Sequence, residues 1–402
     1  MRLGDLCSKI GSGATPRGGG SAYHTSGVAL VRSQNIYNDG FQYDGLAFLG
    51  DAQAAALDNV TLRENDVLLN ITGDSVARAC VLPSRVLPAR VNQHVAIIRP
   101  KPSVLNHRFL HFWLTSPMAQ EFLLQLASAG ATRKALTKGM IEDLDLPDIP
   151  KADQDAIASC LGALDDKIDL NRRTNQTLEA LARALFAHHF PHDPEDDLPA
   201  GWKPCTLAEI AEINPSRSLL AGTPAPYLEM ANMPTTSARA LAWKTRAAGS
   251  GLRFKNGDVL VARITPCLEN GKTAFVDFLQ DGQVGWGSTE YIVIRSKPPV
   301  PPEYAYLLAR TDDFRAHVIQ NMTGTSGRQR ASADCLTQYE VVRPPDDLLT
   351  KFGSQVATFF KALKANDDES YTLAALRDTL LPKLMSGETC IPQAEKEIAS
   401  HA

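Results

Sequence analysis

Apolar residues recur at helical spacing over residues 152–189 and predict one long amphipathic helix. The stripe steps by four and three residues in turn, through Ile157, Leu161, Leu164, Ile168, Asn171, Asn175, Leu178, Ala182 and Leu185. This alternation is typical of a coiled-coil seam. Asparagine occupies two of the seam positions. A polar residue in a seam weakens helix pairing but fixes its register and its partner.

The same stripe returns 195 residues later, with Phe352 in the place of Ile157. The second copy runs through Phe352, Val356, Phe359, Leu363, Leu373 and Leu380, with polar Asn366 and Ser370 at the gap. The segments before the helices repeat as well: residues 141–150 match 336–345, residues 65–69 match 257–261, and residues 98–102 match 294–298. A repeat of this length indicates two copies of one domain-plus-helix unit.

Short apolar runs bounded by Gly, Asn and Asp predict strands, for example over residues 28–31 and 94–98, while residues 106–127 read as helical. We therefore predict an α+β fold with two tandem mixed α/β domains, each followed by a long helix. The predicted boundaries are a first domain at 1–147, a helix at 148–189, a Pro- and acid-rich linker at 190–201, a second domain at 202–345, a helix at 346–387 and a flexible tail at 388–402. Gly387 is the expected C-cap of the second helix.

Each long helix has one apolar stripe and needs a partner to cover it. We expect the two helices to pair with each other as an antiparallel coiled coil, which would give the molecule pseudo-two-fold symmetry. The alternative is that the stripes join separate copies of the chain. The expected pairing seam consists of Ile157, Leu161, Leu164, Ile168, Leu178, Leu185, Phe352, Val356, Phe359, Leu363, Leu373 and Leu380.

Composition narrows the class of protein only a little. Hydrophobic residues make up 44% and charged residues 21%, which is ordinary for a globular chain. The net charge is −4, but it is spread unevenly: residues 1–140 hold about 14 Lys and Arg against about nine Asp and Glu, and the connectors carry the compensating acid. Mildly basic domains are compatible with nucleic-acid contact.

The seven cysteines are scattered and form no Cys-x-x-Cys pair, which argues against disulfides and structural zinc and fits a reducing cytoplasm. The N-terminus has no apolar core of signal-peptide length, and no stretch approaches the roughly 18 apolar residues of a membrane helix.

Familiar catalytic motifs are missing. The chain has no Asn/Asp-Pro-Pro-aromatic loop of the kind that holds a flipped adenine. Gly271, Lys272 and Thr273 resemble the end of a phosphate-binding loop, but Pro266 stands where that motif needs its first glycine. His188, His189 and His192 lack a Cys or carboxylate cluster that would complete a metal site, so an exposed helix end is the better interpretation. We expect no cofactor, metal or catalytic residue in this chain.

Two long stretches resemble a known family. Residues 157–186, IASCLGALDDKIDLNRRTNQTLEALARALF, and residues 376–388, LRDTLLPKLMSGE, are similar to the central and C-terminal helices of the specificity subunits of type I restriction-modification enzymes. Residues 70–74, NITGD, and 287–291, GSTEY, also fit that family's target recognition domains. The resemblance covers nearly the whole chain.

The resemblance implies a non-catalytic subunit in a phage-defence and DNA-methylation system. In this family each recognition domain reads one half of a bipartite DNA target, and the helices set the unread spacer and dock two adenine-N6 methyltransferase subunits. S-adenosylmethionine is then expected on the methyltransferase. ATP and Mg would act on two motor-nuclease subunits, where these are present.

Loops rich in Lys, Arg, Asn, Gln, Ser and Thr are the candidate DNA contacts, because such side chains neutralise phosphates and read base edges. In the first domain they are Arg32, Gln34, Asn35, Thr72, Ser75, Arg78, Asn92, Gln93, Thr132, Arg133 and Lys134. In the second they are Arg263, Thr265, Lys272, Ser288, Thr289, Thr325, Ser326, Arg328, Gln329 and Arg330. For each loop the alternative is an ordinary solvated turn. Trp243 and Trp286 could stack on bases or pack in a core.

Three hypotheses of different classes therefore stand: a DNA-sequence reader that also scaffolds a methyltransferase, a pure protein-interaction scaffold, and a nuclease fused to its own reader. The helix resemblance favours the first, and the third lacks a recognisable metal-carboxylate motif.

Overall fold

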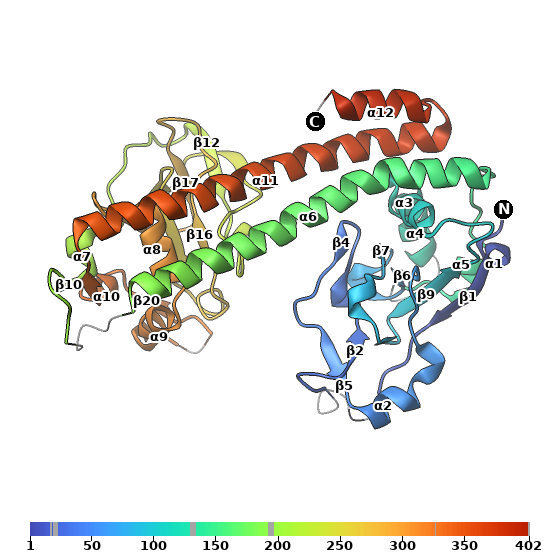
Figure 1. Cartoon of the computed structure of the whole chain (residues 1–402), viewed down its shortest axis with the longest axis horizontal. Helices are drawn as coiled ribbons and strands as arrows, with labels where there is room; N and C mark the ends of the chain where they lie inside the picture. Colours follow the sequence, from blue (N-terminus) through green and yellow to red (C-terminus); the bar gives the residue numbers. More distant parts are fainter. Residues whose placement is uncertain (17, 19–22, 129–133, 192–196, 326, 401–402) are drawn as a thin grey trace. The chain divides into compact units, whose positions relative to one another are not determined.

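The computed structural model describes residues 1–16, 18, 23–128, 134–191, 197–325 and 327–400. The chain forms two compact units. Unit 1 comprises Met1–Lys167 and Thr372–Ala402, and unit 2 comprises Ile168–Tyr371. The two long helices, α6 (Lys151–His189) and α11 (Asp346–Ser386), each contribute one part to unit 1 and the other part to unit 2 (Figure 1).

Unit 1 is built on a four-stranded antiparallel sheet in the order β1 (Cys7–Ser12), β9 (Val95–Pro100), β6 (Val67–Asn70), β7 (Ala79–Val81). A second sheet has the order β5 (Ala47–Leu49), β2 (Val28–Val31), β8 (Ala89–Val91), and its β2–β8 pair is parallel. The smaller elements are α1 (Leu3–Leu6), β3 (Ile36–Tyr37), β4 (Gly40–Phe41), α2 (Asp51–Ala56) and α5 (Lys138–Glu142). The whole of β6 is buried because its Val-Leu-Leu-Asn run is covered on both faces.

The helical segment expected over 106–127 consists of two helices, α3 (His107–Thr115) and α4 (Pro117–Ser128). The break falls at Ser116, whose ψ is 147°, because the residue before a proline avoids the helical region. The Asn106 side chain caps α3 by accepting from the backbone N–H groups of Arg108 and Phe109 at 2.8 and 3.1 Å. In unit 1, α3 lies beside α6 (Figure 1), and Arg108 donates two hydrogen bonds to the Asp166 carboxylate at 2.8 and 2.9 Å.

Unit 2 repeats this architecture. Its main sheet has the order β11 (Ala211–Ile213), β18 (Tyr291–Ser296), β15 (Val259–Ala262), β16 (Thr273–Phe275), again antiparallel throughout. Its second sheet runs β13 (Lys244–Ala247), β12 (Pro224–Leu228), β17 (Gly285–Gly287), β14 (Arg253–Phe254), with a parallel β12–β17 pair. The other elements are β10 (Lys203–Thr206), α7 (Leu207–Ile210), α8 (Pro302–Ala309), α9 (Asp312–Gln320), β19 (Met322–Thr323), β20 (Arg330–Ala331), α10 (Asp334–Thr337) and β21 (Glu340–Arg343).

The repeat extends to a buried carboxylate at the start of the central strand. In unit 1, Asp66 is fully buried and accepts two hydrogen bonds from the Arg99 guanidinium at 2.7 and 2.8 Å. In unit 2, Asp258 is fully buried and accepts from Arg295 and Arg217. Asp66, Asp258, Arg99 and Arg295 belong to the segments that match in the sequence, so the two domains share a charged anchor as well as a strand order.

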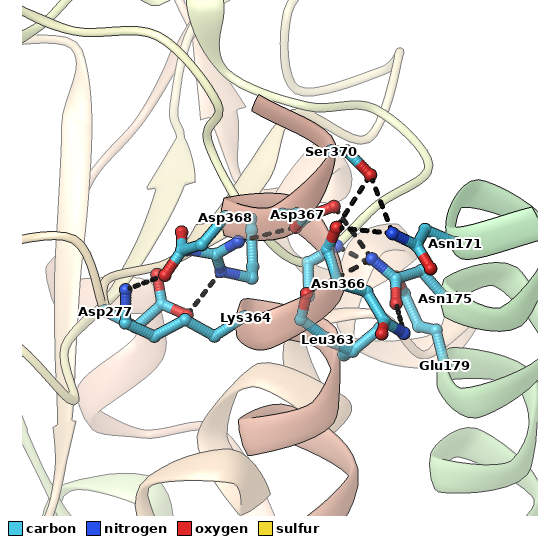
Figure 2. A network of polar contacts seen from close by, with 12 residues as sticks. Asn171, Asn175, Glu179, Asp277, Leu363, Lys364, Asn366, Asp367, Asp368 and Ser370 are labelled. Atoms are coloured by element: carbon cyan, nitrogen blue, oxygen red, sulfur yellow. Dashed lines mark hydrogen bonds and ion pairs between the residues drawn. The ribbon is translucent and has the colours of Figure 1, made fainter. Parts of the chain in front are cut away.

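The two long helices pair antiparallel in unit 2. Asn171 of α6 donates to Ser370 Oγ and to the carbonyl oxygen of Asn366, both at 3.2 Å (Figure 2). Asn175, one turn further along α6, donates to the carbonyl oxygen of Leu363 at 3.2 Å, which lies one turn earlier on α11. Later residues of α6 thus contact earlier residues of α11, so the two helices run in opposite directions. The antiparallel pairing expected from the two stripes is therefore confirmed within this unit.

Unit 1 contains the other parts of both helices. Here Arg377 of α11 donates to the Asp165 carboxylate of α6 at 2.7 Å. The chain then leaves α11 through Gly387, whose φ of +75° is the left-handed conformation expected of a C-cap glycine. The expectation of a flexible tail is wrong, because α12 (Ile391–Ala399) follows. Pro392 in its first turn favours helix initiation, and Ala394 is fully buried.

Most residues of the expected pairing seam are buried. Ile168, Leu178, Leu185 and Phe359 are half-buried. The buried ones are Ile157, Leu161, Leu164, Phe352, Val356, Leu363, Leu373 and Leu380. Phe360, outside the expected set, is only 4% exposed and packs edge-on against Phe275 at 4.9 Å and Tyr306 at 5.6 Å. Part of α11 therefore packs against the second domain as well as against α6.

The predicted fold class is confirmed, with α+β domains in tandem and a long helix after each. Across the described residues, no helix combines the length and the hydropathy that crossing a membrane requires.

Candidate nucleic-acid interface

In unit 1 the predicted contact loops meet at one end of the main sheet. The backbone N–H of Ile71 donates to the carbonyl oxygen of His94 at 3.0 Å, and that of Gly73 donates to Lys134 at 3.2 Å. The Asn70 side chain donates to the carbonyl oxygen of Ser33 at 2.9 Å. The loops at residues 32–35, 71–78, 92–94 and 134–136 are thus parts of one surface, although up to about a hundred residues separate them in the sequence.

This surface of unit 1 presents polar and cationic side chains. Gln93 and Lys134 are exposed, and Thr72 Oγ1 shares a 2.7 Å hydrogen bond with His94 Nδ1. Arg78 lies over the Tyr37 ring at 4.6 Å, which holds the guanidinium in place while its charge persists. Partly exposed Ser75 and exposed Gln34 are also at this surface.

Two predicted contacts are buried and bond the backbone of their own loops. Asn35 is completely buried: its Oδ1 accepts from the backbone N–H of Arg32 at 3.0 Å, and its Nδ2 donates to the carbonyl oxygen of Gln42 at 2.9 Å. Asn92 is 8% exposed, and its Oδ1 accepts from the backbone N–H of His94. Asn35 thus holds the backbone of its own loop and is too deeply buried to read a base, and Asn92 Oδ1 supports the backbone of its own loop.

Unit 2 forms the equivalent surface with the same three backbone hydrogen bonds. The backbone N–H of Arg263 donates to the carbonyl oxygen of Glu290 at 3.0 Å, as the N–H of Ile71 does to the carbonyl oxygen of His94 in unit 1. The Ala331 N–H donates to Arg263 at 2.9 Å, as Leu136 does to Ile71 at 2.9 Å. The backbone N–H of Thr265 donates to the carbonyl oxygen of Gln329 at 3.1 Å, as the N–H of Gly73 does to the carbonyl oxygen of Lys134. The loop cluster is therefore a property of the repeated unit.

The side chains around the unit 2 cluster are polar and cationic. Arg330 donates from Nε to Glu290 Oε1 at 2.8 Å and remains 44% exposed. Arg328 is exposed nearby, and partly buried Lys272 donates to the carbonyl oxygen of Met230 at 2.6 Å. Exposed Thr289 and Thr325, partly exposed Gln329, and Ser288, whose Oγ accepts from the Glu290 N–H at 3.0 Å, complete the surface. Thr132, Arg133 and Ser326 of the predicted set lie outside the described residues.

Buried polar atoms without hydrogen-bond partners gather at these loops. Among the described residues they include Arg32 Nε and Asn70 Oδ1 in unit 1 and Arg263 Nε and Thr265 Oγ1 in unit 2. Leaving such a group without a partner costs about 1–3 kcal/mol. Native structures tolerate few of them, and each calls for a cause such as strain or function. Their position in both units marks the loops as a candidate binding surface.

The sequence analysis did not single out the exposed strand β13 as a candidate DNA contact. All four residues of β13, including Lys244 and Arg246, are exposed. Trp243 just before it is 41% exposed and stacks on Phe278 at 4.4 Å, whereas Trp286 is 8% exposed and packs in a core cluster. The core interpretation therefore holds for Trp286 and not for Trp243. The sequence signal was a basic alternation directly after a tryptophan.

Three comparisons with known proteins bear on this arrangement. A family model described as the type I restriction modification DNA specificity domain matches residues 1–180. The type I restriction enzyme HindI specificity subunit of Haemophilus influenzae is 22% identical over 90% of this chain and 94% of its own length. The MjaIX specificity subunit of Methanocaldococcus jannaschii is 22% identical, covering 75% of this chain and 73% of its own.

The chain is similar over most of its length to the specificity subunits of type I restriction enzymes. The EcoAI specificity subunit of Escherichia coli is 31% identical over 37% of this chain and 26% of its own length. The fold is similar to that of a solved structure: the crystal structure of a type I restriction-modification system S subunit from M. genitalium superposes with a TM-score of 0.59, at 16% identity, over 96% of this chain and 95% of that one.

The described residues bring together no group of three or more His, Cys, Asp and Glu side chains that could hold a metal ion. His188 and His189 pack ring against ring at 5.3 Å near the end of α6, and His192 lies outside the described residues.

Proposed function

We propose that this chain is the DNA-reading, non-catalytic subunit of a type I restriction-modification complex. The domain at 1–147 reads one half of a bipartite target and the domain at 202–345 reads the other. The observation that carries the proposal is the loop cluster: unit 1 and unit 2 build it with the same three backbone hydrogen bonds and surround it with polar and cationic side chains.

The helices supply the second half of the proposal. α6 and α11 set the length of the unread spacer and dock two adenine-N6 methyltransferase subunits, which in turn recruit two motor-nuclease subunits where these are present. S-adenosylmethionine would be bound by the methyltransferase, and ATP with Mg by the motor, so this chain needs only to bind DNA and its partners. Such a complex acts in the cytoplasm, where the DNA is.

Charge argues for shared phosphate binding. The whole chain has a net charge of −4, and residues 1–140 have an excess of only about five basic residues. The number of phosphates that a protein neutralises sets both its DNA affinity and the dependence of that affinity on salt. This chain alone should therefore bind DNA weakly, and the partner subunits should supply further cationic contacts.

A matched pair of variants tests the assignment. In the assembled complex, Arg330→Ala should relax base preference in one half-site only, and Arg78→Ala should relax it in the other. Each lost bidentate base contact corresponds to about 1–3 kcal/mol of discrimination. The measurement is the methylation rate on DNA libraries randomised in one half-site at a time. If either variant affected both half-sites equally, the domains would not be independent readers. If the assembled complex showed no sequence-dependent DNA binding, the scaffold hypothesis would replace this one.

A further inference from the structure

A buried arginine links the second domain to α11 inside unit 2. The Arg239 side chain is 4% exposed and lies just before β13 in the sequence. Its Nε donates to Asp277 Oδ2 at 2.5 Å, and its Nη1 donates to Asp367 Oδ2 of α11 at 2.6 Å. A third carboxylate, that of Asp368, lies 3.7 Å from Nη2. Asp367 and Asp368 lie on α11, and Asp277 lies two residues after the end of β16 (Figure 2).

The residue before this arginine makes a matching contact with α6. The backbone N–H of Ala238 donates to Glu179 Oε2 at 2.9 Å. The other oxygen of Glu179 accepts from the Tyr306 hydroxyl of α8 at 2.6 Å. Glu179 is itself only 6% exposed. Residues 238 and 239 therefore hold the domain against both long helices at once.

The same acid also belongs to the helix pair. Asn175 of α6 donates to Asp367 Oδ1 at 2.8 Å (Figure 2). Arg239 donates to the other oxygen of that carboxylate. The Asn366 side chain donates back to Asn175 Oδ1 at 2.8 Å. One carboxylate, that of Asp367, thus takes part both in the pairing of the two helices and in the attachment of the second domain to α11. A change in either would disturb the other.

Apolar packing alone would fix the position of the second domain on α11 less precisely. Phe360 of α11 packs against Phe275 and Tyr306, but such contacts are non-directional. Buried ion pairs add little net stability because desolvation opposes their attraction, and their best-attested use is to specify one geometry. Burial raises the pKa of the Asp277 carboxyl even though Arg239 opposes this shift, so the charges are held at a cost. A costly, directional contact between a reading domain and its support points to a role in positioning.

We propose that Arg239 is a positioning residue that fixes the orientation of the second domain on the helix pair, and that it thereby sets how strictly the complex discriminates spacer length. The inference rests on the proposed function. It assigns spacer tolerance to one buried ion cluster in addition to helix length.

The test uses the full chain assembled with its methyltransferase and a set of DNA sites whose half-sites are separated by the native spacer or by one base pair more or fewer. The readout is the ratio of methylation rates on native and altered spacers. For Arg239→Gln this ratio should fall about tenfold, and Arg239→Lys should restore part of it. Asp367→Asn, which keeps the size of the side chain, should lower the ratio in the same direction.

Arg173→Gln is the matched control, because Arg173 lies on α6 in the same unit, is 49% exposed and forms its ion pair with Asp169 of the same helix. It should leave the ratio unchanged. A purely structural role would slow methylation at every spacer by the same factor, and an unchanged ratio in both Arg239→Gln and Asp367→Asn would overturn the proposal. If the wild-type complex methylated no bipartite site, the proposed function would fail first, and this inference with it.

Discussion

Asp258→Asn should loosen unit 2 and leave unit 1 intact. The Asp258 carboxylate is fully buried, and each of its two oxygens accepts at least two hydrogen bonds. Oδ1 accepts from Arg295 Nε and Arg217 Nη2, each at 2.7 Å. Oδ2 accepts from the Lys255 N–H at 2.7 Å and again from Arg217. Whichever oxygen the substitution converts to an NH₂ group, that group faces donors.

The magnitude follows from what the change leaves behind. Breaking a buried ion pair by removing one partner costs about 3–5 kcal/mol, because the remaining charge is buried without compensation. Arg217 keeps 10% and Arg295 keeps 30% of its side-chain surface exposed, so water recovers part of the loss. We therefore expect about 3 kcal/mol, which corresponds to a roughly hundredfold change in the opening equilibrium at 1.36 kcal/mol per factor of ten.

Hydrogen exchange measured by mass spectrometry resolves the two units in one experiment. Amides of β15 and β18 should lose protection about a hundredfold in Asp258→Asn, while amides of β6 and β9 keep theirs. Asp66→Asn is the matched variant and should show the reverse pattern. Equal loss in both units would mean that the repeat does not fold as two separate blocks. A loss of less than about tenfold would refute the anchoring role of the buried carboxylate.

Three further predictions address the helices, the buried histidine and the C-terminal helix. Inserting seven residues after Lys167 and seven after Tyr371, at the boundaries between the units, adds about 10.5 Å to each long helix. In a methylation map the unread spacer should then be longer by about three base pairs. An unchanged spacer would contradict the proposal that helix length sets the spacer. Burial lowers the pKa of His111, so as pH falls below about 6.5 the unfolded chain gains a proton that the folded chain does not, and unit 1 should lose at most about 1.4 kcal/mol per pH unit until the lowered pKa is reached. Denaturant titrations between pH 7.5 and 5.5 should show this slope, and His111→Gln should remove it; an identical slope in that variant would refute the assignment. Cys160 is 8% exposed and lines a groove of about 390 Å³ shared with α12, so truncation after Gly387 should speed its alkylation, as followed by peptide mapping; an unchanged rate would show that α12 does not protect it.

The sequence was most informative where the pattern is local or repeated. The heptad stripe predicted α6 and α11 to within a few residues, because alternate steps of four and three match the period of a helix and cannot match the two-residue period of a strand. The step of 195 residues also predicted equivalent loops, and the structure shows them with equivalent hydrogen bonds. Phe359 shows the limit of this reasoning: the repeat step selected it, yet its neighbour Phe360 is the more deeply buried because that face of α11 also meets the second domain.

Other features depend on tertiary contacts that no local pattern reveals. An asparagine in a loop can read a base or bond its own backbone, and only the fold shows that Asn35 does the latter. Arg239 is a single arginine whose two nearest acids lie 38 and 128 residues away in the sequence. The C-terminal helix was missed because it is only nine residues long, and the burial of Ala394 depends on the fold.

The central claim, that this chain chooses which adenines are methylated, is tested most directly by a genome-wide map of N6-methyladenine. The map would compare cells that carry this chain and a type I methyltransferase of the same genome with cells that lack only this chain. The account predicts a bipartite motif with a fixed spacer that is methylated in the first cells and vanishes in the second. A methylated motif that persists without the chain would contradict it.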